Sequence, residues 1–390
     1  MFDVRASMSD PRRACRFRLG AALLLFAGLL LPTGTALADE VWRAALPGWR
    51  YEFPRDHRPH PEFKTEWWYF TGNLQDARGR RFGYQLTFFR QGVRPPAARG
   101  GTTSRFIVDD LKFAHLAVTD VRAEKFRYAQ KLSRGAFGEA GFDAPQDDGG
   151  TRLAWIEDWE LGLAPDGGFV LRAAQDGVRL ELTLSTGKPW VLHGEAGVSQ
   201  KAEGEGRASH YYSGTRLVSR GAVTLDGART EVTGESWFDH EWASNQLAPG
   251  QAGWDWFSLQ FADGTELMLY QMRTTAGGVD PYSSGTFIAA DGTTRHLRRE
   301  DYQLTPNDSW TSRATGGKYP IGWSVTVPSL GLEVKVRTPV REQELVLQPI
   351  AYWEGLIDVA GTRGGVPVRG HGYLELTGYA GALVGLSSER

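Results

Sequence analysis

Cysteine is almost absent from this sequence, since the chain of 390 residues has only Cys15. That cysteine lies in an arginine-rich stretch before an apolar run at residues 19–31, and the small residues Ala36 and Ala38 follow the run. The arrangement predicts a signal peptide over residues 1–38 with cleavage after Ala38, and therefore a periplasmic or secreted protein. The mature chain would then have no cysteine, which excludes disulfides and thiolate metal ligands.

Long apolar runs and an excess of one charge are also missing. The run at residues 19–31 is too short to span a bilayer, and no other segment approaches the length of about 18 apolar residues that a spanning helix needs. The formal net charge is −2, and no basic block runs through the chain. We therefore expect no permanent membrane anchor and no nucleic-acid partner.

Several motifs of enzyme chemistry are absent as well. The sequence contains no Gly-x-Ser-x-Gly elbow, no His-Glu-x-x-His, no phosphate-binding glycine loop and no dinucleotide fingerprint. Serine hydrolase, zinc protease and nucleotide chemistry lose support, and we expect neither a cofactor nor a metal. A metal site built from His57, His60 and a distant carboxylate is the alternative that the sequence leaves open.

The sequence does contain alternating strands separated by Asp-Gly turns. Asp-Gly is a strong hairpin signal because a type I′ turn needs a positive φ at both central residues. Such pairs stand between alternating apolar runs at Asp166-Gly167, Asp176-Gly177, Asp226-Gly227, Asp263-Gly264 and Asp291-Gly292. An all-β protein of barrels or sandwiches is therefore predicted, with enough strands for two units.

The polar stretch at residues 244–253 predicts the boundary between two domains, which we place at 39–247 and 248–390. Residues 123–135 are the best candidate for a helix. The glycine-rich residues 136–150 are expected to form a surface loop.

One stretch of adjacent titratable residues, "GESWFDHEWASNQ", asks for an explanation. On a strand, successive side chains point to opposite faces. Asp239 and Glu241 then share one face with Trp237, while His240 shares the other with Phe238 and Trp242. The three titratable groups do not converge, which argues against a metal site built from this stretch alone, and His240 is expected to face a barrel interior.

A second stretch, "HRPHPEFKTEWWYFTGNL", combines glutamate with tryptophan. Glu66 and Trp68 would lie on one face of a strand and Trp67 and Tyr69 on the other. A buried carboxylate needs a donor to offset the loss of water, so a structural role is the leading interpretation for Glu66 and for Glu354. For His240 the structural and functional interpretations are evenly balanced.

These stretches, with "KFAHLAVTDV" and "YWEG" followed by "GHGYLELTGY", resemble the lipocalin-like family that contains the AttH-like secreted proteins and the carotenoid 1,2-hydratases. The resemblance covers nearly all of the mature chain. It implies two consecutive lipocalin-like antiparallel β-barrels.

The hydratase branch implies addition of water to an isolated double bond of an isoprenoid. That reaction needs an acid to protonate the alkene and aromatic faces to shelter the cation. The resemblance casts His240, Trp242 and Tyr270 as catalytic candidates, but Met272 stands where the family's acid is expected. Asp239 or Glu266 would have to supply the proton instead.

A binding protein is the function that we favour from the sequence. An aromatic barrel pocket would hold an apolar ligand such as a lipid or an isoprenoid, and the AttH-like branch implies a membrane export system, and so a transporter complex, as a partner. The candidate ligand-binding residues are Glu66, Trp67, Trp68, Tyr69, Trp237, Trp254 and Trp256. The hydratase is the alternative, and a purely structural module is a third reading.

Overall fold

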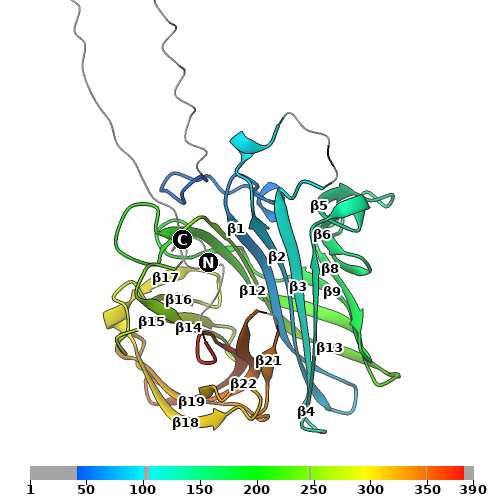
Figure 1. Cartoon of the computed structure of the whole chain (residues 1–390). Coiled ribbons are helices and arrows are strands. Elements are labelled where there is room, and N and C mark those ends of the chain that lie inside the picture. Colours follow the sequence, from blue (N-terminus) through cyan, green and yellow to red (C-terminus); the bar gives the residue numbers. More distant parts are fainter. Residues whose placement is uncertain (1–41, 101–103, 105, 246, 348, 382–390) are drawn as a thin grey trace, which may run out of the picture. The chain divides into compact units, whose positions relative to one another are not determined.

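The computed structural model describes residues 42–381 except 101–103, 105, 246 and 348 (Figure 1). Within this part of the chain the regular structure is almost entirely β, arranged in two antiparallel sheets. The 3₁₀ turns that it contains are η1 (Arg55–His57), η2 (Pro96–Ala98), η3 (Ala136–Gly138), η4 (Arg299–Asp301) and η5 (Pro328–Leu330). No helix in the described ranges has the length and apolar character needed to cross a membrane.

The first sheet is a nearly closed barrel, drawn from blue to green in Figure 1. Its strands pair in the order β4-β3-β2-β1-β13-β12-β9-β8-β7-β6-β5, with β10 and β11 also pairing with β12. The strands are β1 (Thr65–Gln75), β2 (Arg81–Gly92), β3 (Asp110–Asp120), β4 (Lys125–Ser133), β5 (Ala140–Pro145), β6 (Thr151–Ile156), β7 (Trp159–Leu163), β8 (Phe169–Gln175), β9 (Val178–Thr186), β10 (Val191–Leu192), β11 (Val198–Gln200), β12 (Ala208–Leu225) and β13 (Ala228–Ala243).

The second sheet is a half-barrel, and residues 244–250 connect it to the first. Its strand order is β17-β16-β15-β14-β23-β22-β20-β19-β18, with β21 also pairing with β22. The strands are β14 (Gln251–Phe261), β15 (Glu266–Thr274), β16 (Ser284–Ile288), β17 (Thr294–Arg298), β18 (Gln303–Thr311), β19 (Lys318–Val327), β20 (Leu332–Arg337), β21 (Glu344–Val346), β22 (Ala351–Arg363) and β23 (Val366–Leu376).

All five Asp-Gly pairs lie in hairpin turns between consecutive strands, as the sequence predicts. Asp176 and Asp226 have positive φ angles of 51° and 49°, and so do the glycines that follow them. These two turns have the backbone signs of a type I′ turn. In the other three turns, the glycine alone has a positive φ.

Two local predictions were wrong. Residues 123–135 contain no helix. They contain the strand β4, which pairs with β3. Most of its side chains are only partly buried, so its sequence shows no clear alternation of apolar and polar residues. The segment 136–150 is not simply a loop, because it holds η3 and the edge strand β5. Edge strands are short and polar and give weak sequence signals.

The interior of the first barrel is filled with side chains. Its largest buried rings include Trp68, Trp159, Tyr212, Phe238 and Trp242. The segment before β1 also packs Trp49, Tyr51 and Phe53 against this core. The core of this barrel is therefore a packed aromatic interior.

Candidate functional site

A cavity lies between the two sheets. It has a volume of about 350 Å³ and a mostly apolar lining that comes from β1–β4, β12 and β13 of the first sheet and from β14, β15, β22 and β23 of the second. The ligand pocket predicted inside a barrel is therefore replaced by a cavity on the outer face of the first barrel. The physical reason is that aromatic side chains occupy the barrel interior.

Strand register arranges the first-sheet wall of this cavity in two parallel rows of side chains that cross six strands. The polar row, in order across the sheet, is Ser213, Asp239, Tyr69, Thr87, His115 and Gln130. The aromatic row beside it is Tyr211, Glu241, Trp67, Phe89, Phe113 and Leu132. All of these except Ser213 line the cavity.

Asp239 is an acid poised to change protonation near neutral pH. Its Oδ2 accepts a hydrogen bond from Tyr211 at 2.6 Å, and its Oδ1 accepts from Trp237 Nε1 at 2.6 Å and from the Ser213 hydroxyl. Burial raises the pKa of this carboxyl and outweighs the three donors, with a smaller contribution from Glu241, so the pKa rises to about 7. Asp239 therefore exists as acid and as carboxylate at physiological pH.

Glu375 is a second carboxyl of the same kind on the facing sheet. Trp254 Nε1 donates to its Oε2 at 2.8 Å. Burial raises the pKa of Glu375 to about 7, helped by the negative charges of Asp239 and Glu241. Its partner in the strand register is Glu354, which accepts a hydrogen bond from Tyr69 and whose pKa burial also raises well above the ordinary value.

Lys201 supplies a positive charge to the cavity wall. Its Nζ lies 3.3 Å from Glu241 Oε1 and 4.1 Å from the centre of the Tyr270 ring. Burial favours the neutral amine, but Glu241 and Tyr270 together outweigh burial and raise the pKa of Lys201. The hydroxyl of Tyr270 is engaged by the protein itself, with Ser199 Oγ and Ser284 Oγ each at 3.0 Å.

Six of the predicted site residues line the cavity together, namely Asp239, Tyr270, Trp67, Tyr69, Trp254 and Trp256. Trp237 is buried behind them and reaches the site through its hydrogen bond to Asp239. Met272 also lines the cavity, whereas Glu266 is paired with Lys188 and Arg216 away from it.

The structure does not bring His240, Trp242, Glu66 or Trp68 to the cavity. All four side chains point into the first barrel and are fully buried. The expectation that His240 and Trp242 share a pocket with Tyr270 is therefore corrected. His240 follows Asp239 directly on β13, so strand alternation turns its ring to the opposite face.

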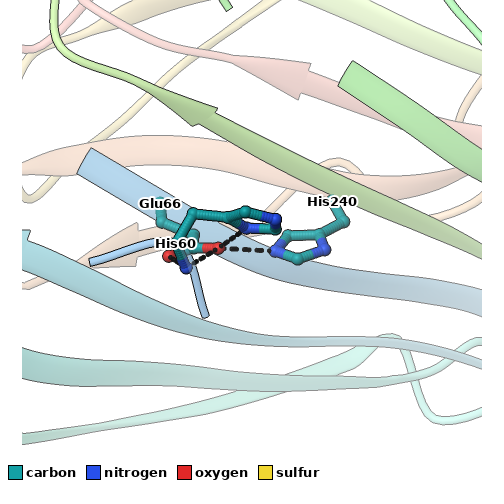
Figure 2. A group of neighbouring side chains, drawn as sticks. All are labelled: His60, Glu66 and His240. Atoms are coloured by element: carbon teal, nitrogen blue, oxygen red, sulfur yellow. Dashed lines mark hydrogen bonds and ion pairs between the residues drawn. The ribbon is translucent and has the colours of Figure 1, made fainter. Parts of the chain in front are cut away.

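His240 instead belongs to a buried hydrogen-bonded cluster with Glu66 and His60 (Figure 2). Glu66 Oε1 lies 2.9 Å from His240 Nε2 and 2.7 Å from His60 Nδ1, and Arg90 Nε donates to Oε2 at 3.0 Å. Burial opposes ionisation of Glu66, but these partners together hold its pKa well below the usual range. Glu66 is thus a buried carboxylate neutralised by its neighbours.

The protonation of the two rings follows from their partners. Burial lowers the pKa of His240 and outweighs the two acceptors that face its ring nitrogens, Glu66 Oε1 at 2.9 Å from Nε2 and the Asp56 carbonyl oxygen at 3.0 Å from Nδ1. For His60, burial is outweighed by Glu66 and Asp56, which raise its pKa. The ring of His60 also stacks on Trp242, with centroids 3.8 Å apart.

One possible ligand atom from each of His60, Glu66 and His240 lies within 4.8 Å of the other two, as in sites that hold a metal ion. The donor set does not fit a cation well. Both oxygens of Glu66 already accept hydrogen bonds, and the Arg90 guanidinium is in direct contact with one of them. We therefore interpret the cluster as a charge network that joins the segment before β1 to β13.

Several cavity residues escaped the candidate set, among them Tyr211, Lys201 and Glu375. Lys201 comes from a region with no legible pattern in the sequence, and Glu375 lies in the stretch "GHGYLELTGY", which was used for the family resemblance alone. The alternation of "SHYYSG" on β12 could have indicated Tyr211, because Tyr211 and Ser213 share the face that borders Asp239 and Glu241.

The fold and the cavity define a two-sheet β protein with an acidic, aromatic cavity between its sheets. Residues 44–379 match the family model described as AttH-like, so the chain belongs to the AttH-like family. The crystal structure of an AttH protein from Nitrosomonas europaea shares 33% sequence identity and superposes with a TM-score of 0.76, covering 86% of this chain and 99% of that one.

Two further relatives are more distant. Kievitone hydratase from Nectria haematococca has a TM-score of 0.66 at 15% identity, covering 88% of this chain and 97% of that one, which shows a shared fold. The dehydratase asqC of Emericella nidulans is 24% identical over 237 residues, or 55% of this chain. The match spans 63% of that dehydratase, which is less than two thirds of its length.

Proposed function

We propose that this protein is a lyase that acts on an apolar molecule bound between the two sheets. It adds water to a carbon–carbon double bond, or removes water from an alcohol to form such a bond. The observation that carries the proposal is the pair Asp239 and Glu375, which line a mostly apolar cavity and whose pKa values burial raises to about 7. General acids and bases work best when their pKa lies near the working pH.

The reaction follows from the positions of these groups. In hydration, Asp239 in its protonated form gives its proton to the alkene, and the electron pair of the double bond forms the new C–H bond. Water then attacks the cation and loses a proton to the Glu375 carboxylate. Dehydration is the same sequence reversed. Asp239 is assigned as the acid because it is 4% exposed, whereas Glu375 is more accessible to water.

The cavity wall also suits the intermediate. Trp67 and Trp254 line the cavity, and the face of an aromatic ring attracts a cation. Tyr211 accepts a hydrogen bond from Trp256 at 3.1 Å while it donates to Asp239. When Asp239 is protonated on Oδ2, it can donate a hydrogen bond to the Tyr211 oxygen instead of accepting one from it. The hydroxyl proton of Tyr211 can then point toward the ligand. The hydratase and the dehydratase among the relatives support the same class of reaction.

The binding-protein reading uses the same cavity and differs in having no turnover. An isoprenoid or another lipid-like molecule suits its lining. Secretion and a transporter partner remain predictions, and the signal peptide predicted over residues 1–38 lies outside the described residues.

Incubation with acyclic isoprenoid alkenes in ¹⁸O-labelled water tests the proposal, with mass spectrometry of the alcohol products. Asp239→Asn should lower turnover by roughly 10²–10⁴-fold, the usual contribution of a general acid. Met272→Leu is the matched control, because it lines the cavity and carries no proton. Binding without labelled product in the wild type would instead support a binding protein, and equal turnover by Asp239→Asn would refute the acid.

A further inference from the structure

The polar row continues beyond the acids into a part of the cavity that the proposed reaction does not use. After Asp239 and Tyr69 it passes through Thr87 on β2, His115 on β3 and Gln130 on β4. All three line the cavity. A polar floor under an apolar cavity fixes the orientation of a ligand that has a polar group of its own.

The hydrogen bonds of His115 determine what this floor offers. Burial lowers the pKa of His115 to about 3, so the ring is neutral. Gln130 Nε2 lies 3.4 Å from His115 Nε2 and can only donate, which places the proton of His115 on Nδ1. Nδ1 then donates to the Tyr352 hydroxyl at 2.8 Å.

Tyr352 is thereby turned into a donor toward the cavity. Burial raises its pKa well above the ordinary value, so it keeps its proton. Since its oxygen accepts from His115, that proton must point to another acceptor. Tyr352 lines the cavity on the side of the second sheet, opposite His115.

Gln85 adds a second unsatisfied group at this wall. Its amide nitrogen contacts Thr87 Oγ1, while no described residue lies within hydrogen-bond distance of its fully buried Oε1. A hydroxyl group would serve either orientation of the amide, because a hydroxyl both donates and accepts.

Charge narrows the class of ligand. Lys201 is the one lysine or arginine among the described residues that line the cavity, and it is paired with Glu241. His115 is neutral, so a carboxylate, phosphate or ammonium group would be buried at this wall without a counter-ion. A neutral hydroxyl meets no such penalty.

The sheet itself sets the distance between this wall and the acid. Asp239 and His115 stand in one row, separated by three strand spacings through β1 and β2. At about 4.8 Å per spacing, the two positions are about 14 Å apart.

We propose that Gln85, Thr87, His115 and Tyr352 form a hydroxyl subsite that binds the alcohol or phenol end of an elongated apolar ligand, with the reacting double bond held about 14 Å away at Asp239. The position of the double bond rests on the proposed function, whereas the recognition of the hydroxyl does not. The substrate class is therefore a long-chain or prenylated alcohol.

Farnesol and its methyl ether test the subsite, because the two differ in the hydroxyl proton. Quenching of tryptophan fluorescence gives the two dissociation constants. The wild type should bind farnesol about tenfold more tightly than the ether, the usual effect of one buried hydrogen bond. Gln85→Met should reduce this ratio to about one, because it removes the buried acceptor Oε1 for the hydroxyl proton. Tyr352→Phe removes a donor from which alcohol and ether can both accept, so it should weaken both ligands, and Tyr270→Phe at the other end of the cavity should retain the ratio.

Equal binding of alcohol and ether by the wild type, or an unchanged ratio in Gln85→Met, would overturn the proposal. If Gln85→Met melts at a lower temperature than the wild type, Tyr352→Phe provides a second variant of the same wall, and unchanged affinity of that variant for farnesol would overturn the proposal. Because these readouts measure binding, they are separate from turnover. Selective binding of farnesol by a wild type that turns over no alkene would refute the lyase alone, and turnover together with equal binding of farnesol and its ether would refute the subsite alone.

Discussion

Asp239 and His240 are neighbours in sequence that serve opposite sides of one strand. Asp239 faces the cavity between the sheets, where three donors surround its carboxyl, and His240 faces the barrel core, where it meets Glu66 at 2.9 Å. On the cavity side, Asp239 provides a group that can exchange protons with a ligand. On the core side, His240 provides a buried link between β13 and the start of β1.

The pKa of Asp239 predicts how stability depends on pH. Its folded pKa, about 7, lies above the ordinary value of 3.8, so the folded protein binds the proton more tightly than the unfolded chain does. Its contribution is present at low pH and is lost as the pH rises from about 4 to about 7. Asp239→Asn should weaken this decline, and urea unfolding at pH 5 and pH 8 measures it. A decline as steep in the variant as in the wild type would contradict the assignment.

The hydroxyl of Ser213 lowers the pKa of Asp239. It donates to Asp239 and lies 2.6 Å from His193 Nε2, while His193 Nδ1 lies 2.9 Å from Thr286. A donor favours the ionised carboxyl, so Ser213→Ala should raise the pKa of Asp239. The alkaline limb of the pH–rate profile for hydration should then move to higher pH.

The control for that change is Ser209→Ala on the same strand, because Ser209 Oγ is buried with no partner in the described structure. Its profile should match the wild type. A shift of similar size in both serine variants would show that the effect comes from packing and not from the hydrogen bond to Asp239.

Glu66→Gln should destabilise the fold without changing the chemistry. The substitution removes the negative charge that His60 and Arg90 share, and uncompensated buried charges typically cost about 3–5 kcal/mol. Denaturant unfolding should report this loss. In protein that remains folded, kcat for hydration should stay near the wild-type value, and a large specific loss of kcat would show that the cluster takes part in the reaction.

The interpretation of the His60, Glu66 and His240 cluster as a charge network predicts no effect of chelators. Dialysis against a strong chelator should leave the melting temperature unchanged, because hydrogen bonds and Arg90 already neutralise Glu66. A fall that one divalent cation reverses in the wild type, and not in His240→Ala, would instead identify a metal site.

Much of this organisation follows from local sequence. Strand alternation separates His240 from Asp239 and Glu241, and the Asp-Gly pairs mark hairpins, because both effects depend only on neighbouring residues. The face that becomes the cavity is different, since it depends on which side of the first barrel the second sheet covers. That is a long-range packing outcome, so the sequence could not decide between Asp239 and His240, which lie on opposite faces of the strand.

Lys201 shows the same limit at the level of one residue. It follows the short strand β11, and its role depends on meeting Glu241 of β13 and Tyr270 of the second sheet. Segments that meet only through the tertiary fold leave no spacing to read in the sequence.

Which side chains face the cavity depends on how β13 is aligned with its neighbouring strands, because each row of the cavity wall takes one residue from each strand. A one-residue slip of β13 against β1 would turn Asp239 and Glu241 inward and bring His240 and Trp242 to the cavity. A deletion of a single residue in this strand could thus exchange an acid site for an imidazole–indole surface while much of the barrel remained paired. Insertions and deletions, more than point substitutions, are the changes by which such a scaffold could acquire a different reaction.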